Sequence, residues 1–144
     1  MRTAALAAAL ALAGGLRAQD EAKELEKLKG TWVIVKAERG GKPADEPKGD
    51  RITFDADKIT VNIRGTERKG KVKIDATKTP KQIDLIAEGE DAPGPAPAIY
   101  ELEGDTLKMA LGRPGGDRPA KFATEEGSMV IVLIFEREKN KEKK

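Results

Sequence analysis

The chain contains no cysteine and no histidine among its 144 residues. These absences exclude a Ser-His-Asp triad, a cysteine nucleophile, thiolate and imidazole zinc sites, and disulfide bonds. Ser128 is the only serine, and the sequence has neither a glycine-rich phosphate loop nor a dinucleotide-binding fingerprint. Aromatic residues amount to 3%. Because the ligand residues and binding motifs are missing, we expect no cofactor. Because disulfide bonds are excluded and aromatic residues are few, we expect a fold that depends on an aliphatic core.

The one long hydrophobic run lies at the N-terminus. Arg2 is followed by an Ala-rich apolar stretch (residues 4–13), and Gly-Gly-Leu-Arg-Ala follows at residues 14–18. This order of charged, apolar and small residues is typical of a secretory signal peptide cleaved after Ala18. The run is too short for a transmembrane helix, which needs about 20 residues, and no Cys is present for lipid attachment. The sequence predicts a signal peptide over residues 1–18 and export to the periplasm or the extracellular space, without a membrane anchor.

The charge balance argues against nucleic-acid binding. Arg2 and Arg17 belong to the predicted signal peptide, which leaves 25 basic and 25 acidic side chains in residues 19–144. A neutral chain with interspersed charges lacks the basic surface that contacts phosphates. Residues 138–144 are rich in Lys and Glu, and we expect a charged, disordered tail there.

From Thr31 onward, apolar residues recur mainly at every second position, which is the pattern of half-buried antiparallel strands. A short helix is expected before them, over residues 20–29, where Ala22, Leu25 and Leu28 share a face before Gly30. The fold class is therefore all-β, with one domain over residues 19–137. The pattern predicts eight strands, over residues 31–38, 51–54, 59–64, 69–75, 82–87, 98–103, 106–111 and 129–137.

The lengths of the connections indicate how these strands are arranged. The first, fifth and seventh connections are long (residues 39–50, 88–97 and 112–128), whereas the second, fourth and sixth are short. In an up-and-down meander, odd and even connections lie at opposite ends, so one end is tight and the other carries long loops. Such a meander closes into a barrel without free edges, and a two-sheet sandwich is the alternative. We expect an eight-stranded antiparallel up-and-down barrel.

Gly30-Thr31-Trp32, at the start of the first strand, resembles the Gly-x-Trp signature of lipocalins. In lipocalins an Arg near the end of the last strand covers that Trp, and Arg137 is the matching residue; the resemblance thus gives Gly30, Trp32 and Arg137 as structural signature residues. Nearly the whole mature chain is similar to an uncharacterised lipocalin-like domain family that is expanded in planctomycete bacteria. The resemblance implies an exported lipocalin-like barrel and no substrate, because the family has no established activity. It is carried by six blocks in order: LKGTWVIVKAERGGKP, ITFDADKITV, KIDATKTPKQIDL, IYELEGDTLKMAL, RPAKFAT and VLIFERE.

Carboxylates are the remaining candidates for catalysis or metal binding. Asp55 and Asp57 lie in a short connection that lacks the Asp-x-Asp-x-Asp-Gly spacing of a calcium loop, and turn chemistry explains them. Glu101 and Glu103 alternate with apolar residues, so we expect them to face solvent instead of a cleft, where a glycosidase needs its two carboxylates. We predict neither a metal site nor an enzyme.

The inward-facing side chains outline the candidate binding site. If Trp32 points inward, a period of two also places Lys36 inside near the open end, where a cation suits an acidic headgroup. A β-bulge would instead turn Lys36 outward. The other inward side chains are mainly medium-sized aliphatics, which suit a packed core or a narrow apolar pocket. The candidate ligand-binding residues are Lys36, Phe54, Ile63, Tyr100 and Met109.

Two functions are consistent with this sequence. The first is the binding of a small apolar or amphipathic ligand inside the barrel. The second is a protein-interaction or inhibitor-type module on a filled barrel, whose open-end loops (residues 39–50 and 112–128) contact an envelope protein. An interior cavity larger than a few water molecules would favour the first.

Overall fold

The computed structural model describes residues 21–90 and 92–138. The predicted signal peptide and residues 139–144 of the predicted tail lie outside the described residues. A helix over residues 21–28 precedes the first strand and buries Leu28, with Leu25 packed against the core. Ala22 is exposed, and Glu24 instead joins Leu28 on the buried face. Within the described residues, no helix is long and apolar enough to cross a membrane.

The described part of the chain contains nine strands, which form one antiparallel meander. Eight of them correspond to the predicted strands, and the ninth, β2, is a two-residue strand within the first long connection. The largest differences are at β5, β7 and β9, which begin at Thr66, Ala96 and Ile131 instead of at residues 69, 98 and 129. The strands are β1 (Gly30–Arg39), β2 (Lys42–Pro43), β3 (Arg51–Asp55), β4 (Lys58–Ile63), β5 (Thr66–Asp75), β6 (Lys81–Ala87), β7 (Ala96–Glu103), β8 (Thr106–Leu111) and β9 (Ile131–Arg137).

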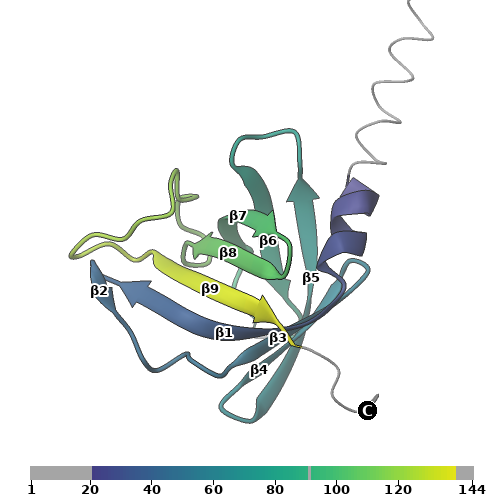
Figure 1. Ribbon diagram of the computed structural model, residues 1–144, viewed down its shortest axis with the longest axis horizontal. Coiled ribbons are helices and arrows are strands. Elements are labelled where there is room, and N and C mark those ends of the chain that lie inside the picture. Colours follow the sequence, from purple (N-terminus) through teal and green to yellow (C-terminus); the bar gives the residue numbers. More distant parts are fainter. Residues whose placement is uncertain (1–20, 91, 139–144) are drawn as a thin grey trace, which may run out of the picture.

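The meander closes on itself. β1 pairs with β3 at its start and with β9 along most of its length, and every other long strand pairs with its sequence neighbours. Since the first and last strands are hydrogen-bonded to each other, the sheet has no open side between them (Figure 1). The prediction of an eight-stranded up-and-down barrel is confirmed, and the sandwich alternative is excluded.

The two ends of the barrel differ, as the connection lengths predict. Short connections follow β3, β5 and β7 at one end, and the N-terminal helix lies beside this end (Figure 1). We call it the closed end. The long connections at residues 40–50, 88–95 and 112–130 leave from the other end, the open end, together with the β4–β5 turn.

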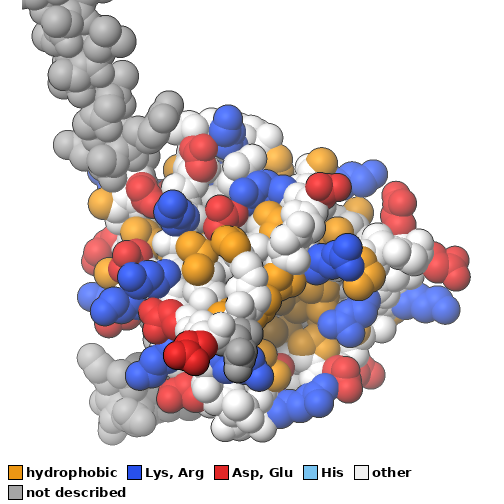
Figure 2. All heavy atoms as spheres, turned by 180° about the vertical axis from the view of Figure 1, so that it is seen from behind, with side chains coloured by type: hydrophobic (Ala, Val, Ile, Leu, Met, Phe, Trp, Pro, Cys, Tyr) orange, Lys and Arg blue, Asp and Glu red, His pale blue; other side chains and the backbone are white. Residues whose placement is uncertain are grey.

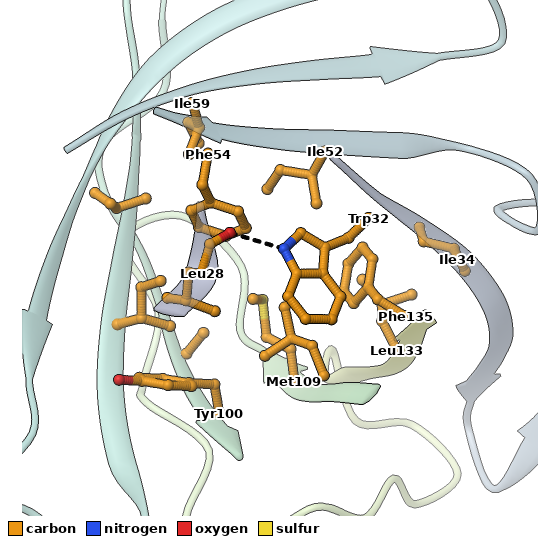
Figure 3. Close-up of a cluster of buried hydrophobic side chains, with 14 of the residues drawn as sticks. Leu28, Trp32, Ile34, Ile52, Phe54, Ile59, Tyr100, Met109, Leu133 and Phe135 are labelled. Carbon is orange, nitrogen blue, oxygen red and sulfur yellow. Dashed lines mark hydrogen bonds between the residues drawn. The ribbon is translucent and has the colours of Figure 1, made fainter. Parts of the chain in front are cut away.

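The core of the closed half is filled by large side chains. Trp32, Phe54 and Tyr100 are at most 1% exposed and lie with Leu28 and Leu107 in one cluster (Figure 3). The Trp32 indole N–H donates to the carbonyl oxygen of Leu28 at 2.8 Å, which satisfies the buried polar atom of the ring (Figure 3). Because most of the aromatic side chains gather here, this half of the barrel is solid.

Arg137 joins the last strand to the helix and to Trp32. Its guanidinium carbon lies 4.3 Å from the centre of the Trp32 ring, and its Nη1 and Nη2 donate to the carbonyl oxygens of Lys29 and Lys27 at 2.9 and 3.0 Å. Those carbonyls are at the helix C-terminus, where a cation is favourable. Gly30 has a φ of +118°, a conformation that favours glycine. The segment that joins the helix to β1 is thus held by the contacts of Arg137 and by the backbone conformation of Gly30.

A β-bulge interrupts β1. Ile34 is opposite Phe135 and Lys36 is opposite Ile134, so Val35 is an additional residue. Val35 and Lys36 are both exposed, and Ala37 is buried. Of the two interpretations of Lys36, the inward position is therefore wrong, and the outward position caused by a β-bulge is confirmed. The bulge reverses the alternation of inward and outward side chains, which keeps a Lys out of an apolar interior and places Ala37 there.

The exposure of the residues of β5 changes at Gly70. The residues before it are exposed, whereas Gly70, Val72 and Ile74 are buried. A Cβ atom at Gly70 would overlap the carbonyl oxygen of Ile86 on β6. The two strands therefore approach too closely there for any other residue.

The longest connection, residues 112–130, lies against the outer face of the barrel. Phe122 and Val130 pack on a second apolar cluster of Ile99, Ala110 and Val132. Arg118 donates to the carbonyl oxygen of Ala98 at 2.9 Å, and its Nη2 lies 2.7 Å from the Asp84 carboxylate. This loop is therefore anchored to the wall.

Candidate functional site

The open half of the barrel contains a cavity of about 230 Å³. Seen from behind, the molecule has a hollow with a hydrophobic floor, and Lys and Arg side chains stand around its edge (Figure 2). One water molecule takes about 30 Å³ of liquid volume, so the cavity has space on the order of eight waters. Its lining consists of Ile34, Arg39, Pro47, Asp50, Arg51, Ile52, Val61, Ile63, Leu85, Met109, Leu111, Ile131, Leu133 and Phe135.

Strand alternation explains why this lining is apolar. β1, β3, β4, β6, β8 and β9 each contribute inward side chains, and ten of the fourteen lining residues are Ile, Val, Leu, Met or Phe. Apart from Phe135, none of the lining residues is aromatic. The closed half is spanned by Trp32, Phe54 and Tyr100, but Ile, Val and Leu do not reach across a barrel of the same width. The cavity is therefore a consequence of side-chain length.

The rim of the cavity is polar. Arg39 ends β1, Pro47 and Asp50 come from the connection at residues 40–50, and Arg51 begins β3. That connection is held along β1, because the N–H of Ile34 donates to the carbonyl oxygen of Asp50 at 2.9 Å and the N–H of Gly49 donates to Ile34 at 2.9 Å. The rim is thus fixed to the barrel wall.

The charged groups of the rim differ in their partners. Arg51 Nε lies 2.7 Å from Glu138 Oε1, and Asp50 Oδ1 accepts the backbone N–H of Arg64 at 3.1 Å. Within residues 21–90 and 92–138, the Arg39 guanidinium has neither a hydrogen bond nor an ion pair. The rim therefore presents one free guanidinium at the edge of an apolar cavity.

The five candidate ligand-binding residues fall into three environments. Met109 lies in the wall of the cavity, and Ile63 lies at its edge with 42% of its surface exposed. Phe54 and Tyr100 are fully buried in the solid half, outside the cavity lining. Lys36 is on the outer surface. The structure thus brings Met109 and Ile63 together in one site with Arg39, Leu85 and Ile131.

Arg39 was missed because its identification depends on the bulge. An uninterrupted alternation from Trp32 places Lys36 and Glu38 inside and Arg39 outside. Residues 32–35 are all apolar, so the sequence gives no sign of where the alternation reverses. The one available signal was the cost of burying a Lys and a Glu side by side in an aliphatic interior.

Tyr100 belongs to a buried polar cluster under the helix. Its hydroxyl donates to Glu24 Oε1 at 2.8 Å, and Glu24 Oε2 accepts from Lys81 Nζ at 3.0 Å and from Lys27 Nζ at 3.3 Å. Glu24 is 5% exposed. Burial acts to raise the pKa of Glu24, but the donors from Tyr100, Lys81 and Lys27 outweigh it and hold the pKa below the ordinary value. Burial, and then the hydrogen bond to Glu24, raise the pKa of the Tyr100 hydroxyl far above its ordinary value. This cluster attaches the helix to the barrel.

A second pocket, a groove of about 400 Å³, lies on the outside of the barrel. Val132, Ile134 and Phe122 form its apolar part, and Lys36 and Lys108 stand beside them, with Lys108 Nζ 5.5 Å from the centre of the Phe122 ring. Ala37 and Glu38 of β1 and Pro43 of β2 complete it. The barrel cavity is the better candidate for a small ligand because its walls surround the ligand on several sides.

The acidic residues are dispersed. Within the described residues, no group of three or more acidic side chains is arranged to hold a metal ion. Asp55 and Asp57 lie at the β3–β4 turn, and Glu101 and Glu103 are exposed on β7. Among the described residues that line the cavity, Asp50 on the rim is the single carboxylate, so the lining contains no carboxylate pair.

Comparison with known proteins adds no relative. No family model matches the chain, and neither a curated protein nor a solved structure does.

Proposed function

We propose that this protein binds a small apolar or amphipathic molecule in the open half of its barrel. The observation that carries the proposal is the cavity of about 230 Å³ between Met109, Leu111 and Ile131, which opens at the end of the barrel with long loops. A filled barrel was the premise of the alternative, protein-interaction function, so the cavity favours ligand binding.

The volume limits the size of the ligand. At about 30 Å³ for each non-hydrogen atom, by analogy with liquid water, the cavity holds on the order of eight such atoms. Burial of one methylene group contributes about 0.8 kcal/mol of binding free energy, so seven methylenes contribute roughly 5 to 6 kcal/mol before the costs of association are subtracted. The gross gain alone corresponds to a dissociation constant of about 0.1 mM, and the costs of association weaken it, so we expect dissociation constants in the millimolar range for a chain of seven or eight carbons.

Octan-1-ol is a suitable first probe, and NMR titration suits this affinity range. Backbone amide shifts of Met109, Leu111 and Ile131 should move together and saturate, whereas those of Trp32 and Phe54 in the solid half should move little.

A variant with a blocked cavity tests whether the ligand binds there. In Leu111→Trp the larger ring occupies space at the partly exposed end of β8, and octan-1-ol binding should fall at least tenfold. Lys71→Trp is the matched control, because Lys71 is exposed on the outer face of β5. If Leu111→Trp and Lys71→Trp both bind like the unmodified protein, the ligand does not occupy the cavity and the proposal is wrong.

We also propose that the protein acts outside the cytoplasm. The support is the sequence of residues 1–18 alone. Expression of the full-length chain followed by N-terminal sequencing of the secreted or periplasmic protein tests it, with cleavage expected near Ala18. An intact Met1 on protein retained in the cytoplasm would contradict export.

A further inference from the structure

We propose that the ligand is an amphipathic monoanion, a carboxylate with a short aliphatic chain, whose charged group pairs with Arg39 at the rim of the cavity. This inference rests on the proposed function and adds the chemical class of the ligand.

The first support is the position of Arg39. The bulge at Val35 puts Lys36 on the outside and gives Ala37 and Arg39 the inward side of β1. Arg39 is the last residue of the strand, so its backbone is fixed by pairing with Ile131 on β9 and with Lys42 on β2. The guanidinium therefore stands at the cavity edge on a rigid element, where it reaches the headgroup of a ligand whose tail lies inside.

The second support is the state of the neighbouring charges. Arg51 is engaged by Glu138, whereas the Arg39 guanidinium is free in the described part of the chain. A planar guanidinium suits the two oxygens of a carboxylate, to which it donates in parallel. An anionic headgroup would give Arg39 a partner without displacing one that it already has.

Asp50 narrows the charge of the ligand. Its carboxylate lies on the same rim. A phosphate monoester carries about −1.5 to −2 charges at neutral pH, and Asp50 would repel it more strongly than it repels a carboxylate. The combination of one free Arg and one Asp thus favours a single negative charge.

Size and charge together suggest octanoate as the probe. Its seven carbons beyond the carboxylate match the eight or so atoms for which the cavity has space, and its headgroup then lies at the level of Arg39. Octan-1-ol and octylammonium contain the same total number of carbon atoms and carry a neutral and a positive headgroup.

The experiment compares the affinities of these three ligands by NMR titration of the unmodified protein and its variants. We expect octanoate to bind about three- to tenfold more tightly than octan-1-ol, and octylammonium to bind most weakly. Arg39→Met keeps the aliphatic stem and should remove the preference for octanoate. Asp50→Asn should increase it, and Lys36→Met, a matched Lys on the outside of the same strand, should leave all three affinities unchanged.

Salt gives a second readout that needs no variant. Raising the ionic strength from about 0.02 to 0.5 M should weaken octanoate binding and leave octan-1-ol binding unaffected. Equal affinities for octanoate and octan-1-ol, unchanged by salt and by Arg39→Met, would overturn the proposed headgroup site while leaving the cavity function intact. If none of the three ligands binds, both proposals are wrong.

Discussion

The carboxylate of Glu24 gives the most quantitative prediction, because its environment is fully defined. Glu24→Gln keeps the shape of the side chain but removes the charge that accepts hydrogen bonds from Tyr100, Lys81 and Lys27. Hydrogen bonds to a charged group contribute about 1.5 to 3 kcal/mol. The side chains of Lys27 and Lys81 are 60% and 39% exposed, so both ammonium groups return to water in the variant, and the larger cost of an unpaired buried charge does not apply. We expect a loss of about 1.5 to 3 kcal/mol in the free energy of unfolding at pH 7.

The pH dependence of this loss has a defined sign. The pKa of Glu24 in the folded state lies below its ordinary value of 4.5. Ionised Glu24 therefore stabilises the folded state. Its contribution is fully present at pH values above 4.5 and is lost as the pH falls through the folded-state pKa. The difference between the unmodified protein and Glu24→Gln should narrow steadily below pH 4.5.

Urea unfolding followed by Trp32 fluorescence measures both effects. Glu26→Gln is the matched control, because Glu26 is exposed on the same helix and its side chain has no role in the cluster. A double-mutant cycle with Tyr100→Phe should give a coupling energy of about 1 kcal/mol or more. A loss below about 0.5 kcal/mol, or a loss of equal size at pH 7 and pH 3, would show that the ionised Glu24 carboxylate does not stabilise the fold.

Three further predictions concern the fold. Ala37→Lys places a charged side chain on the buried inner face of β1 and should destabilise the barrel by more than about 3 kcal/mol, whereas Lys36→Gln, on the outer face beside the bulge, should change the denaturation midpoint little; a stable Ala37→Lys variant would contradict the assigned register. Arg137→Met should lower stability by about 1.5 to 3 kcal/mol through the loss of its bonds to Lys27 and Lys29, and should alter Trp32 emission; unchanged emission would mean that the guanidinium does not lie on the ring. Gly70→Ala should cost about 1 to 3 kcal/mol in thermal or urea unfolding because its Cβ overlaps β6, and a neutral outcome would show that the two strands separate freely.

The fold was accessible from the sequence because its signals are local and mutually consistent. Alternating residues in β4, β5 and β8 mark one buried face, and the unequal connection lengths determine which ends lie together. β2 was missed because two residues, Lys42 and Pro43, are too short to show any alternation. These features follow from strand period and topology alone.

The site was only partly predictable. Met109 and Ile63 follow from alternation within their own strands, so they were identified. Arg39 depends on a bulge in a stretch that is apolar on both faces, and Tyr100 turned out to face Glu24 on the helix instead of a ligand. The cavity itself depends on which side chains lie opposite one another across the barrel. The residue pattern of a single strand does not contain that information.

A crystal structure of the protein under xenon pressure tests most directly whether the open half of the barrel contains an apolar cavity. Xenon binds to apolar cavities without any requirement for a particular headgroup. We expect a xenon peak in the open half of the barrel, between Met109, Leu85 and Ile131, and none beside Trp32 in the closed half. Side chains that meet across the barrel at Met109, with no xenon between them, would show that the interior is filled and would contradict the proposed function.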